Sequence, residues 1–322
     1  MDNRRKTIFR GLCRRGEMIT KPTTLILGAG ASAPFGLPTG YDLLRAVLAL
    51  NEEHAQFSPF EPSQVKRFKE ALSKSGKTSV DAFLEHRPEF IQIGKAAIAI
   101  ILISRENEGA LFNHNGNSWY EYLFNQLNTK FDDFDKNKLG VLTFNYDRSL
   151  EHYLLTSLRH AYGKPMTRCS EKLKSIPIIH LHGDLGELPS LGTALKRPYG
   201  TQLSDATVRV ASKRIKIIHE GIANEPQFKQ AQKILSESEV ICFLGFGFHP
   251  VNLQRLGFDG TDTRKQFPKA SSIFGTSFGL TNAECNHVSN TFRLMLRGNH
   301  LWDYGNWDVL RFLREMGVLQ IR

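Results

Sequence analysis

Cysteine is scarce in this sequence, and its spacing excludes two classes of protein. The four cysteines, at positions 13, 169, 242 and 285, lie far apart and include no Cys-x-x-Cys pair. Structural zinc sites and disulfide frameworks both need cysteines at close, regular spacing. The pattern therefore predicts neither a metal centre nor a disulfide scaffold, and it fits a reducing cytoplasm.

Long apolar runs are also missing. The longest candidate, Ile91 to Ile103, is interrupted by Gln92, Gly94 and Lys95, and it is shorter than the roughly 20 residues that a membrane-spanning helix needs. The paired arginines near the start lack the apolar segment that an export signal requires. We expect a cytoplasmic protein with no membrane segment, and the sequence contains no internal repeat.

Charge is unbalanced rather than absent. The 322 residues carry 42 Lys and Arg against 32 Asp and Glu, a formal net charge of +10 that favours anionic partners such as nucleotides. No recognised nucleic-acid motif is present, so the charge does not indicate nucleic acid directly. Basic residues are concentrated only at the start, where residues 1–22 are expected to form a basic arm; residues 1–17 can equally be an extension before a true start at Met18.

Short apolar runs separated by helical patterns predict an α/β fold. Apolar residues recur at helical spacing from about 41 to 131. We therefore predict a Rossmann-like parallel sheet with helices on both faces, in one domain over 23–322 with a helical insertion at about 41–131. Five runs without strict alternation are typical of parallel strands covered on both faces: 24–27, 139–144, 176–181, 240–244 and 272–275.

Small and polar residues follow each predicted strand, at the edge where parallel sheets bind ligands. Bare amides in the first turn, Gly28-Ala29-Gly30, would attract phosphate, although the same glycines can simply make a structural turn. A dehydrogenase is disfavoured, because Pro34, Gly36, Pro38 and Gly40 break the uninterrupted helix that its fingerprint requires. The later strands are followed by Asn145-Tyr146-Asp147, His182-Gly183-Asp184, Gly245-Phe246-Gly247 and Thr276-Ser277.

Four motifs in order resemble the sirtuin superfamily, and specifically the bacterial sirtuin-like NAD hydrolases of anti-phage defence. The match runs from about Leu25 to Ser277, and SVDAFLEHRPEF at 79–90 is also typical of these proteins. The four-cysteine zinc module of protein-deacylating sirtuins is missing, which argues against a deacylase. The motifs read GAGAS at 28–32 with Gly36-Leu37-Pro38, TFNYD at 143–147, HLHGD at 180–184 and FLGFGFHPVNL at 243–253.

The resemblance implies roles for particular residues. Asn145 would contact the nicotinamide ribose or orient the attacking water, and His182 would act as the general base. His180 is the rival base, and Asp147 would either bind the ribose or nicotinamide or cap the next helix. The expected dinucleotide-binding residues are Gly28, Ala29, Gly30, Ser32, Pro38, Asp147, Gly245, Phe246, Gly247, Asn252, Thr276 and Ser277.

The resembled family implies an activity as well. The implied activity is hydrolysis of the substrate NAD to nicotinamide and ADP-ribose, without a metal. The resemblance further implies that the protein is an effector of anti-phage defence that depletes cellular NAD. Such an enzyme needs restraint, which predicts a homo-oligomer or a separately encoded defence partner such as an ATPase or a nucleotide-sensing protein. Two alternatives stay open: a non-catalytic module that senses NAD or ADP-ribose, and, less favoured, an NAD-dependent protein deacylase.

Overall fold

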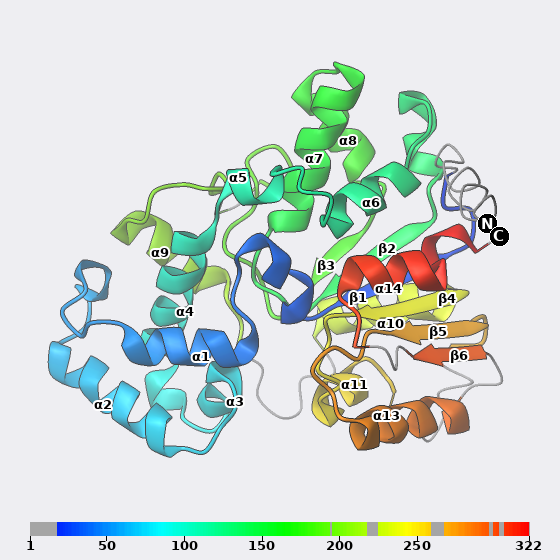
Figure 1. Cartoon of the computed structure of the whole chain (residues 1–322). Helices are drawn as coiled ribbons and strands as arrows, with labels where there is room; N and C mark the ends of the chain where they lie inside the picture. Colours follow the sequence, from blue (N-terminus) through cyan, green and yellow to red (C-terminus); the bar gives the residue numbers. More distant parts are fainter. Residues whose placement is uncertain are drawn as a thin grey trace, which may run out of the picture.

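A parallel β-sheet lies at the centre of the computed structural model, which describes residues 18–193, 195–217, 225–258, 267–295, 299–302 and 306–321. The strand order is β3-β2-β1-β4-β5-β6, and every recorded pairing is parallel (Figure 1). This is the order of a doubly wound Rossmann sheet, so the predicted fold class is confirmed. The strands are β1 (Thr23–Leu27), β2 (Leu139–Thr143), β3 (Ile178–His180), β4 (Val240–Leu244), β5 (Ser272–Gly275) and β6 (Asn299–Trp302).

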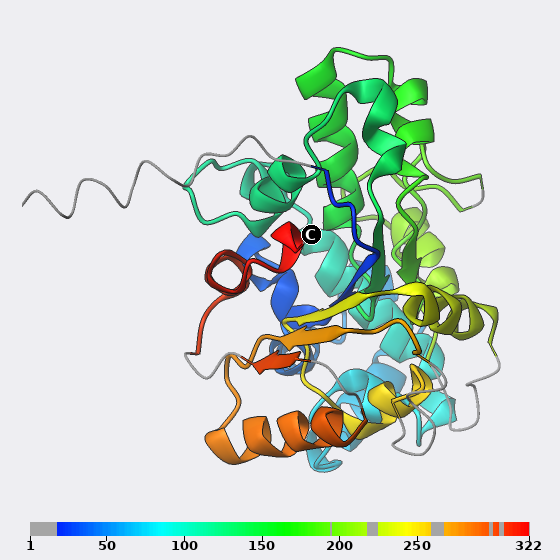
Figure 2. The same cartoon turned by 90° about the vertical axis from the view of Figure 1, so that its right-hand side faces the viewer.

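Helices cover both faces of the sheet, because successive residues of each buried strand point to opposite faces. Leu25 and Val141 pack on one face, and Ile26 and Leu142 pack on the other. Figures 1 and 2 show the two layers on either side of the sheet. The first face carries α6 (Trp119–Gln126), α7 (Ser149–Tyr162), α8 (Met166–Leu173) and α14 (Val309–Met316), and the second carries α10 (Pro226–Glu237), α11 (Pro250–Arg255) and α13 (Asn282–Met295).

The predicted helical insertion is confirmed and has an apolar core of its own. Its central helix, α4 (Ile91–Arg105), is buried on nearly all sides. Burial within the protein explains why this 15-residue helix is apolar all round, although it is too short to span a membrane. This core also includes α9 (Asp205–Arg214), from a later part of the chain (Figure 1). The other insertion helices are α1 (Gly40–Ala49), α2 (Pro62–Lys74) and α3 (Val80–Leu84).

The predicted element limits differ from the observed ones in three places. The insertion core ends near Ile103, because the side chains of α6 and of the short α5 (Glu108–Leu111) pack with the sheet instead. Strand β3 is shorter than predicted, and β6 was not predicted. Of the expected basic arm, residues 1–17 lie outside the described residues, whereas Ile19 already donates its N–H to Asn137 Oδ1 at 2.9 Å.

None of the described helices combines the length and the apolar character needed to cross a bilayer. The three cysteines in the described part of the chain, Cys169, Cys242 and Cys285, are free thiols buried in the protein. Cys13 lies outside the described residues.

Candidate functional site

The candidate site lies between β1 and β4, where the strand order changes direction. The chain winds from β1 towards β2 and β3 on one side, and β4 continues towards β5 on the other. Doubly wound sheets bind ligands outside the carboxyl ends of their strands at such a switch point. The turns that follow β1, β2, β3 and β4 all reach this edge, so the sequence motifs gather in one region of the molecule.

The two glycine turns contact each other directly. Gly28 N–H donates to Leu244 O, and Gly30 N–H donates to Gly245 O, both at 3.0 Å. A Cβ on Gly28 would lie 2.5 Å from Gly245 O, and one on Gly245, where φ is +56°, would lie 2.1 Å from Ala31 N. Glycine is required because the two backbones touch. The expectation that the amides of Gly28 and Gly30 are bare is therefore wrong.

Asn145 joins the end of β2 to the first glycine turn. Its Nδ2 donates to Gly28 O at 3.0 Å and to Ser32 Oγ at 3.1 Å. Its backbone N–H donates to Thr143 Oγ1 at 3.0 Å, and the residue is 8% exposed. Both carboxamide hydrogens are thus used within the protein, so Oδ1 is the atom with which Asn145 would orient a water molecule or a ribose hydroxyl.

Asp147 bonds to the start of the next helix. Its Oδ1 accepts the N–H of Ser149 at 3.1 Å and also the Ser149 hydroxyl. This is an Asx turn and not a helix cap, because the N-cap of α7 is Arg148 and its side chain makes no capping bond. The expected cap at Asp147 is therefore wrong, and contact with a ligand stays a prediction. Burial raises the pKa of Asp147, against the hydrogen bonds from Ser149 and Ser32. Together with Asn145, Tyr120 and Ser32, Asp147 borders a small cavity of about 10 Å³, which is the size of one water.

His182 is buried and has a ring nitrogen without a partner. The residue is 8% exposed, and its Nε2 makes no hydrogen bond. Burial, with a smaller effect of the nearby Arg255 charge, lowers the pKa of His182 to about 3. The ring packs edge-on against Phe144, with 5.3 Å between the ring centroids. A buried unpaired polar atom costs about 1–3 kcal/mol, and a ligand that donates a hydrogen bond to Nε2 would remove this cost.

His180 differs sharply from His182, although only one residue separates them. Burial alone would lower its pKa, but the carboxylate of Glu151 outweighs burial and raises the pKa of His180 to about 9. An imidazole that is protonated at neutral pH cannot accept another proton. Of the two rivals, the neutral His182 is therefore the better candidate for a general base.

Asn145 and His182 reach the same edge of the sheet but face different sides of it. Asn145 lines the small cavity with Leu27 and Val141, whose side chains pack against α6 and α7. The His182 ring contacts Phe144, which packs into the core on the opposite face. The two side chains do not meet in this structure, and a shared ligand would have to lie over the strand ends between them.

The remaining predicted binding residues fall into three groups. Phe246 packs with Phe144, Phe243 and Phe248 and belongs to the core, while Gly247 is exposed. Thr276 supports the second glycine turn, since its Oγ1 accepts Gly245 N–H at 2.8 Å, and Ser277 is buried beside it in the chain. Two residues lie apart from the Asn145 cavity: Asn252 accepts a bond from Arg255 at 3.3 Å, and Pro38 lines a separate cavity of about 510 Å³ with Arg45 and Arg105. Ala29 begins the short 3-10 turn after β1.

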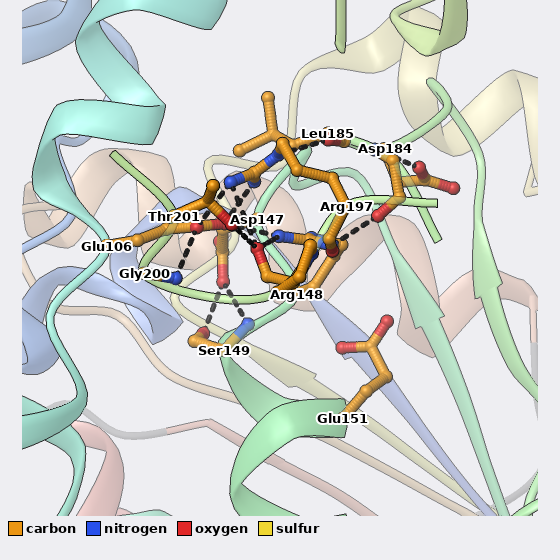
Figure 3. Close-up of polar contacts among 12 residues, drawn as sticks. Glu106, Asp147, Arg148, Ser149, Glu151, Asp184, Leu185, Arg197, Gly200 and Thr201 are labelled. Atoms are coloured by element: carbon orange, nitrogen blue, oxygen red, sulfur yellow. Dashed lines mark hydrogen bonds and ion pairs between the residues drawn. The ribbon is translucent and has the colours of Figure 1, made fainter. Parts of the chain in front are cut away.

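No sequence pattern indicated the buried charge cluster that lies beside the Asp147 turn. Glu106 accepts from Arg148 Nη2 at 2.8 Å, from Arg197 Nη1 at 2.8 Å and Nη2 at 2.5 Å, and from Gly200 N–H at 2.9 Å. Figure 3 shows both guanidinium groups converging on this carboxylate. Burial opposes its ionisation, but Arg197 and Arg148 together lower the pKa of Glu106. The cluster ties the insertion to the residue that follows Asp147.

The contact between the glycine turns predicts a position-specific effect of one added methyl group. Gly245→Ala should lower the free energy of unfolding by about 3 kcal/mol or more, because the Cβ clashes with the Ala31 backbone and the residue has a positive φ. Gly247→Ala, two residues away, should change the free energy of unfolding by less than about 1 kcal/mol, since no atom lies within 4 Å of its Cβ position. Urea unfolding of both variants tests this; equal effects would contradict it.

The buried cluster predicts strong destabilisation when its only carboxylate is removed. Glu106→Ala leaves the buried Arg148 and Arg197 without their counterion, and it should cost about 3–5 kcal/mol of unfolding free energy. Glu108→Ala is the matched control, because that carboxylate is 62% exposed and its partner in the described part of the chain is His152. Its effect should stay within about 1 kcal/mol. A small effect of Glu106→Ala in urea unfolding would show that the cluster is not formed.

The pKa of His182 predicts a loss of stability in acid. The folded-state pKa of about 3 lies below the ordinary value of 6.5, so the unfolded chain binds the proton more readily. Stability contributed by neutral His182 is complete above pH 6.5 and is lost as the pH falls from 6.5 towards 3. Unfolding free energies measured between pH 7 and 4.5 should fall more steeply for the wild type than for His182→Gln. Parallel profiles would contradict the burial of a neutral ring.

Compared with known proteins, the chain matches no protein-family model and no curated protein. The functional argument therefore depends on the residues of the site themselves. Within the described part of the chain, no group of three or more His, Cys, Asp or Glu side chains is placed to hold a metal ion.

Proposed function

We propose that the chain binds NAD over the carboxyl edge of the sheet and hydrolyses it to nicotinamide and ADP-ribose. The observation that carries the proposal is the unpaired Nε2 of His182, a buried neutral imidazole at the end of β3. The switch-point position beside the two glycine turns supports a dinucleotide as the ligand. The ordered motifs that resemble sirtuin-like NAD hydrolases support both the role of His182 and the dinucleotide ligand.

The proposed reaction uses water and two side chains. Water attacks the ribose carbon that carries nicotinamide, the carbon–nitrogen bond breaks, and the bonding electrons leave with neutral nicotinamide. His182 Nε2 accepts a proton from the water or from a ribose hydroxyl, and Asn145 Oδ1 orients the nucleophile. The balance is NAD⁺ and water to nicotinamide, ADP-ribose and one proton.

The closed geometry implies that the site opens before the reaction. The amides of Gly28 and Gly30 are bonded to the end of β4, and the Asn145 cavity holds about 10 Å³. On the His182 side, Tyr146 donates to Asp81 of α3, and Arg255 lies 3.4 Å from Glu85, which directly follows α3. These insertion contacts support a restrained resting state. We propose that release depends on oligomerisation or on a separately encoded defence partner, as an effector that depletes cellular NAD requires.

One observation favours a non-catalytic NAD or ADP-ribose sensor as the second candidate. Asn145 already bonds to Gly28 and Ser32 through both hydrogens of its carboxamide, and its side chain faces away from the His182 ring. A binding module needs the glycine turns but does not need these two residues to act together. The sensor therefore predicts dinucleotide binding with no release of nicotinamide.

The test is nicotinamide release from NAD, followed by chromatography, together with calorimetric binding of ADP-ribose. Asn145→Ala and His182→Ala should each reduce the rate about 100-fold or more, because each removes a group that acts on the nucleophile. His160→Ala, at an exposed position on α7, is the control and should leave the rate unchanged.

Each result points to one account. Binding of ADP-ribose without turnover in the wild type supports the sensor. No binding and no turnover contradicts both accounts, and full activity in His182→Ala contradicts the role of that ring.

A further inference from the structure

The His180 ring lies between two groups that can only accept hydrogen bonds. Its Nδ1 is 2.9 Å from the backbone oxygen of Asn145, and its Nε2 is 2.5 Å from Glu151 Oε1. A carbonyl oxygen never donates, and an ionised carboxylate has no hydrogen to give. If Glu151 is ionised, both ring nitrogens must carry hydrogens, and the ring is then an imidazolium.

The ring connects three elements that meet at the candidate site. His180 is the last residue of β3 and pairs with Thr143 at the end of β2. The Asn145 carbonyl belongs to the turn after β2, and Glu151 lies in the first turn of α7. The same turn carries the Asn145 side chain that reaches Gly28, so the position of that carboxamide depends on what holds its backbone.

The charges around the ring favour the protonated state. Asp184 adds a second negative charge near His180, although it also binds Arg214 at 2.6 Å. His180 and Glu151 line a cavity of about 520 Å³ at the edge of the sheet, together with Lys174, Arg148 and Glu187. Arg148 pairs with Glu106 at 2.8 Å, and Glu187 lies 2.9 Å from Arg214. Glu151 is thus the carboxylate that bonds directly to the ring.

We propose that His180 is a positioning residue: as an imidazolium held by Glu151, it binds the Asn145 carbonyl and fixes the turn that presents the Asn145 side chain. The two histidines of HLHGD then have separate tasks. His180 stays charged and holds the turn, while His182 stays neutral and accepts a proton. The link to catalysis rests on the proposed function, whereas the charge of the ring and its effect on Asn145 do not.

Nitrogen-15 NMR of the full chain with labelled histidine and asparagine tests the charge directly. At pH 7.5 both ring nitrogens of His180 should be protonated, with a titration midpoint near pH 9. In Glu151→Gln the new amide can donate to Nε2, so a neutral ring keeps both bonds and the midpoint should fall by at least one pH unit. A neutral His180 ring in the wild type at pH 7.5 would overturn the proposal.

Two further variants separate positioning from general damage. His180→Ala should move the side-chain amide signal of Asn145, while Glu151→Gln should leave it in place. The matched control is His152→Gln, which alters the next residue of α7, where His152 Nε2 lies 3.1 Å from the exposed carboxylate of Glu108. It should change neither the His180 titration nor the Asn145 signal. An unmoved Asn145 signal in folded His180→Ala would contradict the proposal.

Activity and stability complete the test. The wild type should have a higher free energy of unfolding than Glu151→Gln. This difference should be complete below pH 6.5 and should be lost as the pH rises towards 9. If NAD is hydrolysed, His180→Ala should lower kcat about 10-fold or more with little change in KM, whereas Glu151→Gln should retain most of the wild-type kcat. Absence of NAD hydrolysis in the wild type would count against the proposed function only, since the NMR results decide the role of His180.

Discussion

The close contact between the turns after β1 and β4 is the constraint on which the rest of the site depends. Gly28 and Gly30 bond to the end of β4, and a side chain on Gly28 or Gly245 would collide with the facing backbone. Asn145 then bonds to Gly28 O, and Thr276 accepts the Gly245 N–H, so the ends of β2 and β5 are attached to this contact. The glycines therefore hold this edge of the sheet together. A pyrophosphate can bind there only if the hydrogen bonds between the two turns are replaced by hydrogen bonds to the ligand.

The edge combines buried charges that are held in ion pairs with a buried neutral imidazole. Glu106 pairs with two buried arginines, and Glu151 pairs with His180. Paired buried charges fix geometry because separating them leaves a charge without a counterion. His182 is the exception, since its Nε2 has no partner and burial keeps the ring neutral. Arg148 Nε is also buried without a partner, but it belongs to a paired cation, whereas the neutral His182 nitrogen can accept a hydrogen bond from a ligand.

Much of the fold could be predicted from the sequence, but the interior of the site could not. Runs such as Val240 to Leu244 are buried on both faces, which is why continuous apolar character identified them. The strand Asn299–Trp302 is only four residues long and mixes polar with apolar types, so no such signal exists. Glu106 and Arg197 lie 91 positions apart, and no local spacing relates them. The opposite charge states of His180 and His182 come from partners on other elements, which a two-residue spacing cannot reveal.

A structure of the protein with ADP-ribose bound tests the central claim most directly. That claim is that a dinucleotide lies over the switch point, with its ribose between the end of β2 and the end of β3. We expect a ribose hydroxyl within hydrogen-bond distance of His182 Nε2, Asn145 Oδ1 on the same sugar, and the Gly28 and Gly245 turns moved apart. A ligand bound elsewhere, for example in the 520 Å³ cavity beside β3, with His182 Nε2 still unpaired, would contradict the account.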